Sequence, residues 1–149
     1  GILYDEAEEW YLIALEHLED LGDQRGVGDE SRQLGVLFHE QQKYEEALEW
    51  YTQARDIFEQ MGDVQRLART YGQIGMVYEE QEDVESALEW VSRTYRLMVE
   101  HELPVIIQVK AHLARLRDKI GNEEFHKWWL THNDEVAPAD LDVDTSAIF

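Results

Sequence analysis

The 149-residue sequence contains no cysteine, which excludes disulfide bonds and cysteine-based zinc or thiol chemistry. It has only two prolines, and no apolar run approaches the roughly 18 residues that cross a bilayer. Strand-like alternation of β-branched residues is also absent, whereas helix-favouring Leu, Glu, Ala, Gln and Arg predominate. We therefore expect an all-α, cytoplasmic protein held together by packing alone.

Basic residues are scarce, with 13 Lys and Arg against 33 Asp and Glu, so the formal net charge is −20. A field of this sign repels phosphate backbones and anionic lipids, which makes nucleic acid and membrane poor partners. A basic protein partner is easier to accommodate, but an acidic surface also serves solubility. Charge alone therefore identifies no partner.

A repeat dominates the sequence. Similar segments begin at positions 4, 44 and 84, a spacing of 40 residues. The alanines and tryptophans that recur in register are Ala7, Ala47, Ala87, Trp10, Trp50 and Trp90. A second recurring pair is Leu34-Gly35-x-x-Phe38 and Ile74-Gly75-x-x-Tyr78. A fixed period of this length is typical of stacked supersecondary units.

Each period predicts two amphipathic helices, because apolar residues recur at i, i+3, i+4 and i+7. Gly22 and Gly62 favour left-handed helix ends, and Asp63 is suited to cap the following helix. Gly35 and Gly75 lie inside the first helix of their periods, where glycine costs about 1 kcal/mol relative to alanine. We expect them to allow close approach of Ala47 and Ala87 on the second helices.

These residues resemble the tetratricopeptide repeat over about residues 2–121. The residues that match its first helix are Tyr71, Ile74, Gly75 and Tyr78, and those that match its second are Ala47, Tyr51 and Ala54. Ser31, Val91 and Thr94 depart from the pattern. The spacing is similar to a long variant found in prokaryotic multidomain signalling proteins. The resemblance implies an α-α superhelix of antiparallel hairpins that binds other proteins.

The repeat predicts a helical domain over 1–132. Its parts are a lone second helix at 3–21, hairpins at 26–61 and 64–101, a final helix at 105–120 and a short capping helix at 122–131. Phe125, Trp128, Trp129 and Leu130 are expected to cover the end of the core. Residues 133–149 contain five acids and no Lys or Arg, which predicts a solvated, flexible tail. Because the first helix of the first repeat is missing, we expect a fragment of a longer array, with Tyr4, Leu12 and Leu15 partly uncovered.

Nothing in the sequence indicates catalysis or a cofactor. The six histidines show no metal-ligand spacing, and no glycine-rich phosphate loop occurs. Asp140, Asp142 and Asp144 match the opening of a calcium loop, but Thr145 replaces its glycine. We therefore expect neither an enzyme nor a metal site.

The resemblance places the ligand in a concave groove lined by first helices. The positions carried over are Arg32, Val36, His39, Arg69, Met76, Glu79, His112, Leu116 and Lys119. This face is more basic than the whole molecule and pairs cations with apolar side chains. It suits an acidic, partly apolar peptide, which arginine can bind through two hydrogen bonds. Val36 and Met76 replace the asparagines of chaperone-binding relatives, which disfavours chaperone binding.

Three alternatives remain open. The tryptophan series is either a binding ladder or, the interpretation we prefer, a set of contacts from each hairpin to the next. The chain is either an interaction module of a signalling protein or a segment that self-associates through its N-terminal helix or its tail. The acidic tail, finally, is a possible occupant of the groove, because Lys110, Arg115, Arg117 and Lys119 make the last long helix basic.

Overall fold

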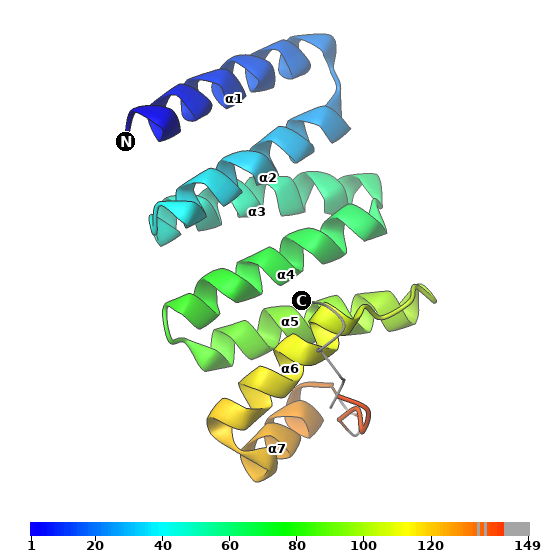
Figure 1. Cartoon of the computed structure of the whole chain (residues 1–149). Coiled ribbons are helices and arrows are strands. Elements are labelled where there is room, and N and C mark those ends of the chain that lie inside the picture. Colours follow the sequence, from blue (N-terminus) through cyan, green and yellow to red (C-terminus); the bar gives the residue numbers. More distant parts are fainter. Residues whose placement is uncertain (134, 136, 142–149) are drawn as a thin grey trace.

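A computed structural model describes the chain except residues 134, 136 and 142–149. The described residues form seven helices and no strand, and Figure 1 shows them stacked along the length of the molecule. Their bounds are α1 Ile2–Leu21, α2 Gln24–Glu40, α3 Tyr44–Met61, α4 Val64–Glu80, α5 Val84–Glu100, α6 Ile107–Ile120 and α7 Asn122–Asn133. None of these helices combines the length and apolar character that a membrane span requires. The fold is an all-α stack of antiparallel helical hairpins.

Glycine and aspartate define the boundaries between the first hairpins. Gly22 and Gly62 end α1 and α3 with φ values of 72° and 68°, in the left-handed region that costs glycine nothing. The next residues, Asp23 and Asp63, accept hydrogen bonds from backbone N–H groups in the first turns of α2 and α4. Each boundary therefore follows from a Gly-Asp pair. The start of α6 differs from the predicted 105, because Ile106 is extended and the helix begins at Ile107.

The mid-helix glycines allow close packing of α2 on α3 and of α4 on α5. A Cβ at Gly35 would lie 2.5 Å from Tyr51 Cδ1, and one at Gly75 would lie 2.6 Å from Val91 Cγ2. We expected Ala47 and Ala87 to be the residues that lie directly opposite Gly35 and Gly75, and this expectation needs correction. The nearest atoms belong to Tyr51 and Val91, one helical turn further along, while the carbonyl oxygen of Ala87 lies 3.6 Å from a Cβ at Gly75.

Trp90 packs in the direction opposite to the one expected for the tryptophan series. Trp90 lies against helices that precede it: its ring centroid is 5.4 Å from that of Tyr71 in α4 and 5.5 Å from the Arg55 guanidinium of α3. Trp50 is also half-buried, against the core formed by α1 to α4. No described helix precedes α1, and Trp10 is 71% exposed. Leu12 is exposed as expected, whereas Leu15 is buried, contrary to expectation.

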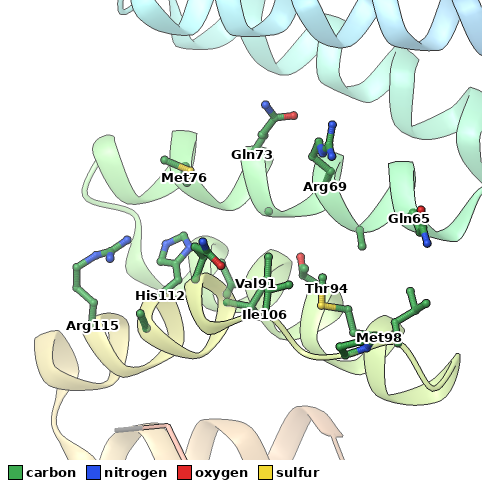
Figure 2. A pocket seen from close by; sticks show the side chains of 17 residues that line it. Gln65, Arg69, Gln73, Met76, Val91, Thr94, Met98, Ile106, His112 and Arg115 are labelled. Atoms are coloured by element: carbon green, nitrogen blue, oxygen red, sulfur yellow. The ribbon is translucent and has the colours of Figure 1, made fainter. Parts of the chain in front are cut away.

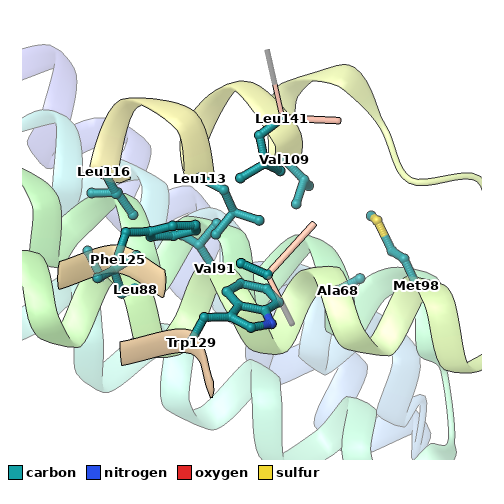
Figure 3. Packing of buried hydrophobic residues seen from close by; sticks show 12 residues of the cluster. Ala68, Leu88, Val91, Met98, Val109, Leu113, Leu116, Phe125, Trp129 and Leu141 are labelled. Carbon is teal, nitrogen blue, oxygen red and sulfur yellow. The ribbon is translucent and has the colours of Figure 1, made fainter. Parts of the chain in front are cut away.

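The other end of the stack is covered. Phe125 and Trp129 of α7 are fully buried against α6, but Leu130 points outward and is 57% exposed, contrary to the prediction. The prediction of a solvated tail is wrong for Ala137 and Leu141, which are also buried. Figure 3 shows Leu141 beside Val109 and Leu113 of α6. Because α7 has 12 residues against 18 in α3, it leaves part of α6 for Leu141 to cover.

Candidate peptide-binding groove

A pocket of about 690 Å³ lies between α4 and α6, with α5 and the segment before α6 completing its wall. Figure 2 shows the side chains that α4, α5 and α6 contribute to its lining. Its size falls within the roughly 300–1,000 Å³ of ligand sites in proteins. Because α4 and α6 are first helices of their hairpins, the pocket occupies the face on which the sequence predicts a ligand.

The pocket has an apolar base and a polar rim. The apolar residues include Ala68, Val91, Met98, Ile106 and Val109. The polar and charged residues are Gln65, Arg69, Gln73, Thr94, Gln108, His112 and Arg115. No aspartate or glutamate is among the described residues that line it, although the chain holds 33 of them. The lining thus differs in charge from the rest of the molecule.

One face of α4 supplies a continuous side of the pocket. Arg69, Gly72, Gln73 and Met76 follow the i, i+3, i+4, i+7 spacing that places residues on one side of a helix. Arg69 and Met76 are exposed there, Met76 to 44%. The residues on the opposite side of α4, such as Leu67 and Ile74, are buried. The amphipathic pattern of α4 therefore directs this stripe into the groove.

Two arginines provide the positive charge at one side of the pocket. Arg69 forms no ion pair with any carboxylate of the described residues. Arg32 of α2 also lacks an ion pair there, and its Nη1 lies 3.5 Å from Gln73 Oε1. Burial first, and then the nearby charge of Arg69, lower the pKa of Arg32 below its ordinary value. Both guanidiniums stay charged at neutral pH and are suited to hold a carboxylate.

On the other side of the groove, Arg115 and Lys119 share one carboxylate, that of Glu79. Arg115 Nη2 lies 2.8 Å from Glu79 Oε1, and Lys119 Nζ lies 3.0 Å from Glu79 Oε2. Burial acts to raise the pKa of Glu79, but the hydrogen bonds from Arg115 and Lys119 outweigh it and lower the pKa to about 2. Burial also lowers the pKa of His112 to about 4, against the attraction of Glu79. Within the described part of the chain, Arg69 and Arg32 are therefore the cations at this groove without a carboxylate partner.

The residues predicted for the groove divide into three groups. Arg69, Met76 and His112 line the pocket, and Arg32 contacts it through Gln73. Glu79 and Lys119 bind each other at its end, and His39 pairs with Glu80. Val36 is half-buried against the α2–α3 core, and Leu116 is fully buried in the core beneath α6, so it does not face a ligand.

The sequence interpretation missed Gly72, which lines the pocket. A signal for it exists, because position 72 lies 40 residues after Arg32 and 40 before His112. The predicted groove positions include Arg69 in place of Gly72. A glycine carries no side chain to suggest a contact, so the register was the only indication.

Comparisons with known proteins agree with this architecture. The family model described as tetratricopeptide repeat matches residues 3–60 and 29–100, and the chain belongs to this family of helical repeats. A solved structure, the crystal structure of BtubC (BKLC) from P. vanneervenii, is similar with a TM-score of 0.70 and 22% identity. The match covers 96% of this chain and 65% of that one, and at this identity it shows the fold alone. The comparison with curated proteins found no match.

Family membership defines the general class of activity. Tetratricopeptide repeats generally mediate protein–protein interaction and form a non-catalytic scaffold. Among the described residues, no group of three or more His, Asp or Glu side chains is arranged to hold a metal ion. The chain is thus a protein-binding scaffold, and its groove is the site to examine for a partner.

Proposed function

We propose that the groove between α4 and α6 binds an acidic, partly apolar segment of a partner protein, within a signalling or regulatory assembly. The observation that carries this proposal is the charge of the lining. In a molecule with a net charge of −20, no carboxylate of the described residues lines this pocket, and two arginines beside it form no ion pair with any of those residues. Such a site attracts carboxylates that the remaining surface repels.

The apolar base limits the partner further. Val91, Met98 and Val109 form a surface that gains nothing from a purely acidic ligand. Met76 and Ile106 extend this surface to the rim, where they are 44% and 46% exposed. A segment that alternates acidic and apolar side chains satisfies both parts of the site.

Calorimetric titration with a synthetic peptide tests the proposal. The probe is a blocked pentapeptide of sequence DEFED, titrated into wild type, Arg69→Gln and Arg32→Gln. Hydrogen bonds to charged groups contribute about 1.5–3 kcal/mol, so each substitution is expected to weaken binding roughly tenfold or more. The matched control is Arg93→Gln, because Arg93 pairs with Glu89 on α5 and does not line the groove. An equal loss in the control, or no loss in either groove variant, contradicts the proposal.

Self-association is a second candidate, supported by the exposed apolar surface of α1. Ile2, Leu3 and Trp10 are 76%, 81% and 71% exposed. Charge opposes pairing of two such helices, because α1 has no Lys or Arg and carries Asp5, Glu6, Glu8, Glu9, Glu16, Glu19 and Asp20. Sedimentation equilibrium distinguishes the candidates. A monomer at all concentrations favours the groove, whereas a dimer lost in Trp10→Glu favours self-association.

A further inference from the structure

Gly72 occupies a distinctive position in the groove. The 40-residue register places Arg32, Gly72 and His112 at the same point of α2, α4 and α6. The outer two carry long or ring side chains, whereas the middle one carries none. The groove therefore has a gap in its row of side chains at the centre of α4.

Packing between helices does not account for Gly72. A Cβ at Gly35 or Gly75 would lie within 2.6 Å of a neighbouring side chain, so those glycines are required for close approach. The nearest atom to a Cβ at Gly72 is Thr94 Oγ1, at 4.0 Å. The position thus has room for a side chain, yet it keeps the residue least favourable to a helix apart from proline.

The space over Gly72 has an apolar surface. Val91, Thr94 and Met98 of α5 line the same pocket, together with Ile106 and Val109. Val91, Met98 and Val109 belong to the core beneath α4 and α6, so their positions are fixed by packing. A side chain entering here would replace water against a preformed apolar wall.

Arg69 adds a charge next to this space. It precedes Gly72 by three residues, a separation that places neighbours on the same helix face roughly 5–6 Å apart. We infer that the gap at Gly72 accepts a large apolar side chain of the partner segment, aromatic or leucine, while Arg69 binds a carboxylate next to it in the partner sequence. This inference rests on the proposed function and specifies the ligand of the same site.

Two peptides test the specificity. DEFED and DEAED have the same charge and differ only in the central side chain. Burial of a phenylalanine side chain predicts that wild type binds DEFED at least roughly tenfold more tightly than DEAED. Gly72→Leu fills the gap, and its affinities for the two peptides are expected to fall within about twofold of each other.

Helicity and melting temperature show that the variant is folded, which we expect because leucine favours helices more than glycine does. Gln60→Leu is the matched control, since it adds the same side chain at an exposed helical position of α3 that does not line the pocket. This control is expected to keep the preference for DEFED.

The outcomes separate this inference from the proposed function. Equal affinity of wild type for both peptides, with both weakened by Arg69→Gln, overturns the role of Gly72 and leaves the acidic-ligand groove standing. A preference for DEFED that persists in Gly72→Leu also overturns it. Binding of both peptides that is insensitive to Arg69→Gln contradicts the proposed function, and the inference with it.

Discussion

Aromatic side chains are exposed at one end of the helical stack and buried at the other. At α1, Trp10 is 71% exposed and its apolar neighbours Ile2 and Leu3 are exposed with it. At α7, Trp129 is fully buried, and Phe125 and Leu141 complete the cover over α6. The two residues are of the same type, and each lies on the helix at one end of the described stack. What differs is whether a neighbouring segment packs against the helix, which is the property that makes repeat stability depend on adjacent units.

The largest expected difference is between the two tryptophans themselves. Trp129→Ala removes a fully buried side chain, which is expected to reduce the free energy of unfolding by about 3–5 kcal/mol. Trp10→Ala changes an exposed side chain and is expected to alter it by no more than about 0.5 kcal/mol. Urea denaturation followed by circular dichroism measures both. Similar losses in the two variants would mean that α1 is covered in solution.

His112 and Glu79 form a titratable cluster between α6 and α4, so the stability of this part of the stack is expected to depend on pH. Burial holds the pKa of His112 at about 4, whereas the unfolded chain binds that proton near the ordinary value of 6.5. Acid therefore favours the unfolded state, and each pH unit between 6.5 and 4 costs up to about 1.4 kcal/mol. His112→Gln removes this contribution, so its stability is expected to fall less steeply over that window.

The control for this effect is His17→Gln, which changes an exposed histidine of α1. Urea denaturation at several pH values gives the slopes, and a His112→Gln slope equal to that of wild type refutes the assignment. Glu79 acts at lower pH. The ionised Glu79 contributes fully to the free energy of unfolding above the ordinary pKa of 4.5, and this contribution is lost as the pH falls toward 2.

The smallest expected effect compares a covered with an uncovered glycine. Gly35→Ala places a Cβ 2.5 Å from the Tyr51 ring, and overpacking is expected to outweigh the helix gain and cost about 1 kcal/mol. Gly72→Ala meets nothing closer than 4.0 Å and is expected to stabilise by roughly 0.5–1 kcal/mol. Thermal unfolding of the two variants shows directly whether each substitution raises or lowers the stability. Stabilisation by Gly35→Ala would contradict the helix pairing of α2 and α3.

The sequence was a good guide where a local rule decides the structure. Gly62 and Asp63 set a helix boundary through their own backbone and side chain, so the pattern alone predicts it. It was a poor guide where the outcome depends on neighbours. Trp90 packs backward against Tyr71, and Leu116 turns into the core, because the lateral arrangement of hairpins decides which face is covered. Leu141 is buried because α7 is short, which its acidic context conceals.

The same reasoning applies to the groove. Met76 and His112 stand at recurring positions of the repeat and line the pocket, and Arg69, three residues before the register position of Gly72, lines it as well. Arg115 was not among the groove positions, because its contact with Glu79 joins α6 to α4 across 36 residues of sequence. Charge pairing of this kind follows from tertiary structure and leaves no periodic signal.

The most direct test of the account is to map where an acidic ligand binds, using backbone amide NMR shifts of the full chain titrated with DEFED. The account predicts that the largest shifts occur at groove residues of α4 and α6, such as Gly72, Gln73 and Ala111, while α1 remains unchanged. Shifts confined to the exposed face of α1 around Trp10 would contradict it, because the ligand site would then be the uncovered end of the stack and not the groove.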